Sequence, residues 1–233
     1  MKNIKFTYIG KYYYDVCERP RPSSAFVPDW YRDMPEYLGH DNRIVVNYNN
    51  SNATAKKCIP MLDEIITGYT IPLWADVQVQ QMPELPMLSW RVSQDVFELH
   101  GPTSKLVPPP PGFSTTVYKF IAGLRIETPP GYSVMIKQPS GHTDLPFHVI
   151  PAIVDTDKSV IENNFPMWIE EGFEGIVEKG TPMVQVVPFK REDWKAEFDW
   201  ITFDQFNAER DKGARSTIRN NYTKNIWTKK RFK

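Results

Sequence analysis

Positive charges and aromatic rings are interleaved in the last part of the chain. Residues 210–233 carry nine basic residues and one acidic residue, whereas the preceding 209 residues carry 19 basic and 27 acidic residues. Basic side chains contact phosphates and aromatic rings stack on bases, so the combination suits a nucleic-acid partner. It equally suits docking onto an acidic surface of a like subunit, and a solvated tail is the commonest outcome. The residues concerned are Arg215, Arg219, Tyr222, Trp227, Lys229, Lys230 and Arg231.

Metal-ligating residue types are few and are not spaced for coordination. The four histidines show no HxxxH or HxH spacing. His142 and Asp144 form an HTD segment that would need a distant third ligand. Cys17 and Cys58 lack metal-type spacing and are too few for a disulfide framework. The sequence therefore predicts no metal and no resident cofactor.

Proline sets the class of fold that must position these residues. The chain has 21 prolines and only 12 glycines, and the prolines extend from Pro20 to Pro188. Interior proline costs a helix about 3 kcal/mol, so a helical bundle is excluded. A content of 41% apolar residues also argues against disorder. Short apolar runs separated by proline and glycine predict a mainly β domain with strands in 70–82, 87–100, 115–127, 131–139, 147–155, 163–171 and 182–189.

The segments before this β series are predicted to be short and extended. Residues 1–15 form an aromatic-rich run with strand character. Residues 19–38 are rich in proline and are expected to form an arm, either an intramolecular strap or an arm that wraps a neighbouring subunit. Residues 43–48 predict a strand, and 58–66 predict a short helix that Gly68 ends.

The composition changes after Pro188, which is the last proline of the sequence. Trp194, Phe198, Ile201 and Gln205 fall at i, i+4, i+7 and i+11, which predicts a short helix with one apolar face. Gly213 is a plausible end for that helix. We therefore expect three parts: an N-terminal strand and arm over 1–42, a β domain over 43–190, and a C-terminal helix with a basic tail over 191–233.

Four ordered segments carry a resemblance to a known fold. GYTIPLWADVQV (68–79), TPPGYSVMIKQPSG (128–141), VIPAIVDTDK (149–158) and FEGIVEKGTPMVQVVPF (173–189) are similar, in this order, to segments of the trimeric dUTPases. The resemblance covers just over half of the chain. It implies the β-clip fold that dUTPases share with dCTP deaminases, and it implies a trimer.

The same resemblance implies a nucleotide site with Mg²⁺. Asp155 occupies the place of the general base that activates water, and Ser140 with Gly141 occupies the phosphate-binding turn. Lys158 stands where those enzymes have a stacking tyrosine, so the pattern departs from the family. Thr70 and Pro139 replace an acidic residue and the phosphate-binding arginine.

These departures and a plainer interpretation both weigh against catalysis. Phosphoryl chemistry depends on positioned charges, so the loss of several charge partners should cost many orders of magnitude in rate. VDTDK (154–158) and Ser140–Gly141 also fit ordinary turns. We therefore expect a non-enzymatic protein, with a dUTPase or dCTP deaminase-like nucleotide-binding or nucleotide-hydrolysing protein, using Asp155 as base, as the alternative.

The sequence as a whole also resembles a family encoded mostly by tailed bacteriophages, cyanophages among them. PDWYRDMP (28–35), KKCIPMLDEIITGYTIPL (56–73) and TPPGYSV (128–134) carry this resemblance. It implies a phage structural or assembly protein, plausibly a virion component, that contacts copies of itself and other phage structural proteins. No run of about 18 apolar residues and no signal peptide is present, so we expect a virion or host-cytoplasm protein rather than a membrane or secreted one.

Overall fold

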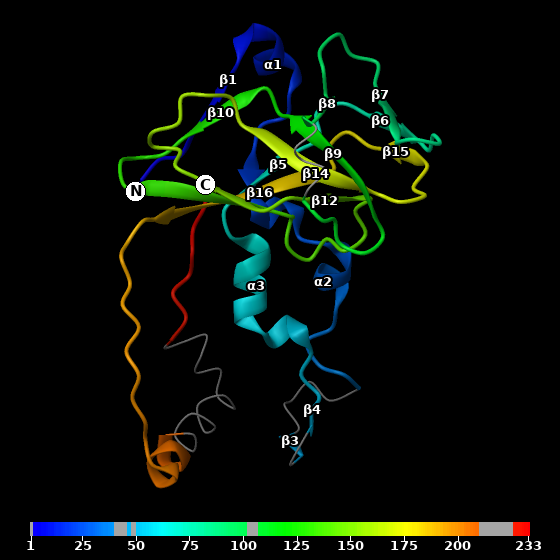
Figure 1. The fold of residues 1–233 in the computed structure, drawn as a ribbon. Helices are drawn as coiled ribbons and strands as arrows, with labels where there is room; N and C mark the ends of the chain where they lie inside the picture. Colours follow the sequence, from blue (N-terminus) through cyan, green and yellow to red (C-terminus); the bar gives the residue numbers. More distant parts are fainter. Residues whose placement is uncertain (1, 40–45, 48–49, 102–106, 210–225) are drawn as a thin grey trace. The chain divides into compact units, whose positions relative to one another are not determined.

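The computed structural model describes residues 2–39, 46–47, 50–101, 107–209 and 226–233. In these residues the chain is mainly β, with several antiparallel sheets and a few short helices, which confirms the predicted class (Figure 1). The chain forms two compact units. Unit 1 comprises Met1–Val27, Ile65–Arg191 and Phe232–Lys233, and unit 2 comprises Pro28–Glu64 and Glu192–Arg231. The predicted division into 1–42, 43–190 and 191–233 stays a prediction.

A five-stranded antiparallel sheet forms the centre of unit 1. Its strand order is β13 (Ala152–Val154), β11 (Tyr132–Lys137), β16 (Pro182–Lys190), β5 (Tyr69–Pro72) and β2 (Arg21–Pro22). β16 is the middle strand and pairs with β11 and β5. Its Met183–Val186 stretch is buried on successive residues, so both faces of the sheet are covered there.

The other strands of unit 1 form three smaller antiparallel sheets. The four-stranded sheet has the order β12-β14-β9-β8, the three-stranded sheet has the order β15-β6-β7, and β1 pairs with β10. The strand bounds are β1 (Lys5–Tyr8), β6 (Val77–Gln80), β7 (Met87–Ser89), β8 (Phe97–Leu99), β9 (Phe113–Ile121), β10 (Leu124–Glu127), β12 (Phe147–Val149), β14 (Asn164–Glu170) and β15 (Gly175–Val177). Every strand predicted between residues 70 and 189 is therefore confirmed in part of its range.

Large aromatic side chains fill the core of unit 1. Trp74, Phe120, Phe147 and Phe165 are fully buried, and the Trp74 Nε1 donates to the Ile121 carbonyl oxygen at 2.8 Å. Burial of an indole needs such an acceptor, because an unpaired donor in the core is costly.

The aromatic run at the N-terminus differs from its prediction. β1 covers only Lys5–Tyr8, and α1 (Gly10–Val16) follows as a helix. Tyr12 and Tyr13 of α1 pack edge-on against Trp74, with ring centroids 6.5 and 5.6 Å away. The strand expectation is wrong for α1 because this tertiary contact outweighs the strand preference of tyrosine.

The proline-rich segment begins as an intramolecular strap. β2 pairs with β5, and η1 (Ser23–Phe26) follows it in unit 1. The Thr70 Oγ1 donates to the Ser23 Oγ at 3.0 Å, and both side chains are buried. Of the two interpretations of the arm, the strap is confirmed for these residues. Thr70 thus serves the packing of this strap.

Unit 2 is built from short elements, with α3 spanning the boundary with unit 1. They are α2 (Asp29–Asp33), β3 (Val46–Asn47), β4 (Asn50–Ser51), η2 (Ala55–Lys57) and α3 (Ile59–Ile66). The predicted helix over 58–66 is confirmed. The strand predicted over 43–48 is present at β3, and the rest of it lies outside the described residues. Gly68 has φ +78°, and a Cβ there would collide with the Val186 carbonyl oxygen, so only glycine fits where α3 gives way to β5.

Helices in the described residues are short, as the prolines predict. α1 has seven residues, α2 has five and α3 has eight. None of the helices described is long and apolar enough to cross a lipid bilayer.

Candidate assembly surface

Arg191 closes unit 1 through a cluster of ionic contacts at the end of β16. Its guanidinium donates to both carboxylate oxygens of Asp157, at 2.8 and 2.5 Å, and lies 3.2 Å from the Asp155 Oδ1. The hydrogen bonds from Arg191 lower the pKa of Asp157 to about 2. The Ser133 Oγ also donates to the Asp155 Oδ1 at 2.6 Å. The cluster fixes the point at which the chain passes from β16 into residues 192–209.

Asp155 and Lys158 lie in a turn, as the plainer interpretation of VDTDK predicts. The Asp155 carbonyl oxygen accepts hydrogen bonds from the backbone N–H groups of Lys158 and Ser159, each at 3.0 Å. Lys158 is exposed. The carboxylate expected to act as a base thus sits in a charge network with Arg191.

Ser140 and Gly141 also form a turn, with a different set of partners. The Ser140 backbone N–H donates to the buried Gln185 side chain at 2.9 Å, and the Lys137 Nζ donates to the Ser140 Oγ at 2.7 Å. Gly141 has φ +82°. The buried Gln185 side chain thus accepts a hydrogen bond from this turn.

The structure places the two predicted halves of a nucleotide site apart within one chain. Ser140 follows β11, whereas Asp155 lies beside Ser133 near the beginning of that strand. At about 3.3 Å per residue, the intervening strand separates them by roughly 20 Å. Pro139 is buried and itself supplies neither a charge nor a backbone N–H to a phosphate. The nucleotide site, with its Mg²⁺, stays a prediction.

Part of the predicted basic tail is anchored in unit 2. The Trp227 Nε1 donates to the Asp63 Oδ2 at 2.9 Å, and the Lys230 Nζ lies 2.5 Å from the same oxygen. Lys229 and Arg231 are exposed. Arg215 and Arg219 lie outside the described residues. Tyr222 also lies outside the described residues, so two of the seven tail residues named above, Trp227 and Lys230, make contacts within unit 2.

The segment that follows Arg191 is exposed, in contrast to the anchored residues of the basic tail. We define the aromatic arm as residues 193–201. Trp194 is 88% exposed, Phe198 95% and Trp200 79%. In Figure 1 the arm, drawn in orange beyond β16, runs as an extended trace with no helix or strand. Three large aromatic side chains are thus exposed on one short segment, and exposed apolar surface of this kind is common where proteins bind partners.

The predicted C-terminal helix begins later than expected. Residues 203–209 are helical, and the Thr202 Oγ1 accepts from the Gln205 backbone N–H at 3.2 Å. The Gln205 Oε1 in turn accepts from the Thr202 backbone N–H at 2.9 Å, which completes a capping box. The helix prediction is wrong for 194–202, where Trp194, Phe198 and Ile201 remain exposed in the part of the chain that the structure describes. A short helix whose apolar face is not packed is unstable in water.

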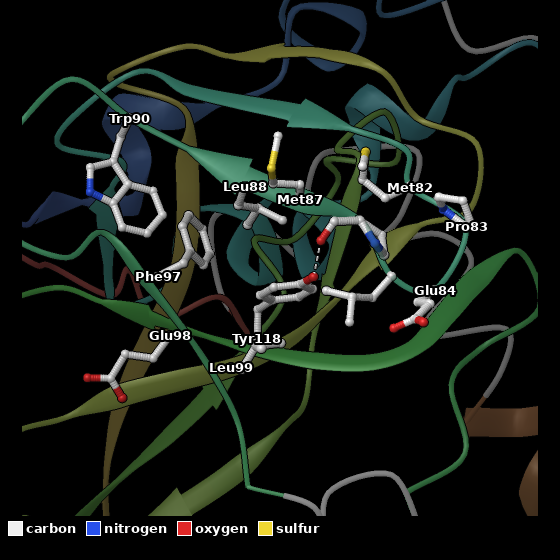
Figure 2. A pocket seen from close by; sticks show the side chains of 12 residues that line it. Met82, Pro83, Glu84, Met87, Leu88, Trp90, Phe97, Glu98, Leu99 and Tyr118 are labelled. Carbon is white, nitrogen blue, oxygen red and sulfur yellow. Dashed lines mark hydrogen bonds between the residues drawn. The ribbon is translucent and has the colours of Figure 1, made fainter.

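An apolar cavity lies in unit 1 between the edge strands of two sheets. It has a volume of about 550 Å³ and is lined by the loop before β7, by β7 itself, by β8 and by Tyr118 of β9 (Figure 2). The Tyr118 hydroxyl donates to the Pro86 carbonyl oxygen and holds the loop over the cavity. Burial raises the pKa of Tyr118 to about 12, so the ring stays neutral. The apolar lining includes Met82, Leu85, Met87, Leu88, Phe97 and Leu99.

Sequence reasoning missed both the aromatic arm and this cavity. The arm's residues were assigned to a helical face, and the cavity is made by residues from three strands that the sequence does not bring together. Comparison with known proteins finds no matching protein family and no curated relative. In the residues that the structure describes, no three His, Cys, Asp or Glu side chains gather as a metal site would require.

Proposed function

We propose that this chain is a non-enzymatic assembly protein that associates with further copies of itself through its aromatic arm. The exposure of Trp194, Phe198 and Trp200 carries the proposal. Full burial of a large apolar side chain contributes about 1.5–3 kcal/mol, so three contribute roughly 5–9 kcal/mol. A single chain does not gain this free energy, because the three side chains stay in water. Association with another copy would bury them and gain it.

The size of this gain favours a closed assembly over a single arm contact. Association costs an estimated 4–15 kcal/mol, so one arm alone supports weak binding at most. In a closed ring each copy donates one arm and receives one arm, so there are as many arm contacts as copies. Building the ring takes one association step fewer than the number of copies. The trimer implied by the dUTPase resemblance would have three arm contacts for two association steps. The antiparallel sheets of unit 1 are compatible with the β-clip core of that resemblance.

The biological setting of the proposal is a tailed bacteriophage. The resemblance carried by PDWYRDMP, KKCIPMLDEIITGYTIPL and TPPGYSV supports a virion component that contacts other phage structural proteins. The exposed Lys229 and Arg231 leave part of the tail available to such partners or to nucleic acid. Detection of the chain in purified particles of its phage tests this setting. Its consistent absence from those particles would contradict the virion role.

Assembly itself is tested by the solution mass of the full chain. Sedimentation equilibrium of the wild type should give a mass of at least two copies, whereas the triple variant Trp194→Ser, Phe198→Ser, Trp200→Ser should sediment as a monomer. The control variant Val160→Ser, Ile161→Ser changes two similarly exposed residues outside the arm and should keep the wild-type mass. A monomeric wild type at all accessible concentrations would refute the proposal.

A further inference from the structure

The aromatic arm has the residue pattern of a β-strand that lacks a sheet. From Asp193 to Trp200, polar and apolar residues alternate without interruption. Successive side chains of an extended chain point to opposite faces, so Trp194, Ala196, Phe198 and Trp200 share one face of the arm. The polar side chains at 193, 195, 197 and 199 share the other. This alternation is typical of a strand with one buried face.

The apolar cavity of unit 1 offers the matching surface, because open strand edges flank it. β7 is the last strand of the order β15-β6-β7, and β8 is the last strand of the order β12-β14-β9-β8. Each of these two strands therefore keeps one edge without a partner in the pairings described. Open edges supply backbone N–H and C=O groups to an incoming strand, and pockets beside them select its side chains. Figure 2 shows Phe97, Leu88 and Tyr118 facing the cavity between them.

We propose that the aromatic arm of one copy adds as a β-strand to the edge of β7 or β8 in a second copy and places its aromatic face in this cavity. The inference rests on the proposed assembly function and names the surface that receives the arm. The aromatic side chains of the arm are exposed and the cavity is open. A second copy would supply each of these two elements with its complement.

The charges around the cavity bear on how the arm would be oriented. The arm carries Asp193, Glu197 and Asp199 against Lys195. The first cavity is lined by Glu84 and by Glu98, whose carboxylate pairs with Lys119 at 2.6 Å. A second cavity, which shares Trp90 with the first, is lined by Arg91 and Lys179 together with Asp76. The acidic face of the arm would therefore be directed away from Glu84 and toward Arg91 and Lys179.

The buried area is sufficient for a specific contact. Three buried aromatic side chains remove roughly 450–750 Å² from water. The surface that they cover on the receiving copy roughly doubles this area. The sum approaches the ~1,200–2,000 Å² that specific protein interfaces bury.

A complementation experiment with two full-length variants tests the inference. The donor-deficient variant is Trp194→Ser, Phe198→Ser, Trp200→Ser, which keeps the cavity. The acceptor-deficient variant is Met87→Glu, Leu99→Glu, which keeps the arm and places two charges in the cavity. Met87 is 43% exposed and Leu99 56%, so the fold tolerates the change. Each variant alone should sediment as a monomer, and an equimolar mixture should form a 1:1 complex with weaker affinity than the wild-type assembly, because only one arm contact holds it together.

The outcomes separate this inference from the proposed function. If the acceptor-deficient variant assembles like the wild type while the donor-deficient variant does not, the arm binds elsewhere and only the inference is overturned. If both variants are monomeric and their mixture shows no association, the arm and the cavity are not complementary and the inference is again overturned. If the wild type is monomeric, both fail. The control Ile153→Glu, Val160→Glu adds the same charges at exposed residues outside both cavities and should assemble normally. Circular dichroism of every variant confirms folding.

Discussion

Two segments near the C-terminus have similar aromatic content, but one is anchored by contacts within the chain and the other is exposed. In residues 226–233, Trp227 donates to Asp63, and Phe232 packs edge-on against Tyr69 with ring centroids 5.7 Å apart. In the aromatic arm, Trp194 and Phe198 are almost fully exposed. The difference lies in the partners that the chain supplies. Asp63 and Tyr69 receive the first segment, and the described residues of the chain supply nothing equivalent to the second.

The comparison separates structural aromatic residues from those available for assembly. An aromatic ring with a hydrogen-bond or stacking partner in its own chain contributes to the stability of one copy. An exposed aromatic residue contributes only when another surface covers it. Substitutions in the anchored segment should therefore change unfolding, and substitutions in the arm should change association.

The largest effect is expected at Asp63, which holds the anchored segment. The Asp63→Ala substitution removes the acceptor for both Trp227 and Lys230. Hydrogen bonds to charged groups contribute about 1.5–3 kcal/mol each. Because Lys230 is partly exposed, we discount its share and expect a loss of about 2–3 kcal/mol. Urea unfolding measures this loss, and faster tryptic cleavage at Lys229–Arg231 reports release of the segment.

Asp33→Ala is the matched control for Asp63→Ala. Asp33 is an exposed aspartate at the end of α2, and its contact with Arg32 lies on the surface. Such a substitution should change the unfolding free energy by less than about 0.5 kcal/mol. Equal losses for the two variants would contradict the anchoring role of Asp63.

A smaller effect distinguishes the two phenylalanines. Phe232→Ala removes the ring that packs against Tyr69. At a fully buried position, a Phe→Ala substitution lowers the unfolding free energy by about 3–5 kcal/mol. Phe232 is only half-buried, so the expected loss is roughly 1–2 kcal/mol. Phe198→Ala should leave the unfolding free energy of the monomer unchanged, since the ring makes no contact to lose. Thermal unfolding at low protein concentration measures both, and a destabilised Phe198→Ala monomer would contradict the comparison.

The sequence predicts the β domain well because its signals are local. Apolar runs bounded by proline and glycine identify the strands between residues 70 and 189, and Gly68 marks the end of α3. The turn at Asp155 is equally local. Each of these features depends on residues that are neighbours in the chain, so each can be predicted from the sequence alone.

The periodicity of the aromatic arm fits both a helix and a strand, so it does not decide between them. Trp194, Phe198 and Ile201 fit a helical face, whereas Trp194, Phe198 and Trp200 fit one face of a strand. A surface to pack against decides between the two, and the sequence does not reveal that surface. The capping box at Thr202 and Gln205 is the local signal that places the start of the helix. The cavity could not be predicted, because it combines residues of β7, β8 and β9.

A pH effect is expected where the anchored part of the chain meets the arm. Arg191 lowers the pKa of Asp157 to about 2 from an ordinary value of 3.8. As the pH falls, the unfolded chain therefore takes up this proton before the folded chain does. The stabilisation by Asp157 is complete above about pH 4 and is lost as the pH falls toward about 2. Asp157→Asn should flatten the fall in melting temperature over this range.

Asp193→Asn provides the comparison for the pH effect. Asp193 lies two residues beyond Arg191, in the exposed arm. Its substitution should leave the acid-dependent fall in melting temperature as steep as in the wild type. If both variants flattened that fall equally, the Arg191–Asp157 pair would not be its cause.

The smallest effect is expected at Asp155, where the assembly and nucleotide hypotheses differ most. Its carboxylate is half-exposed and already contacts Ser133 and Arg191, so Asp155→Asn should cost less than about 1 kcal/mol. With Mg²⁺ and either dUTP or dCTP, wild type and variant should both release no pyrophosphate above the blank. Neither nucleotide should raise the melting temperature. Mg²⁺-dependent release that Asp155→Asn abolishes would instead make Asp155 a base. The charge network at Arg191 would then be part of an active site rather than the anchor from which the arm extends.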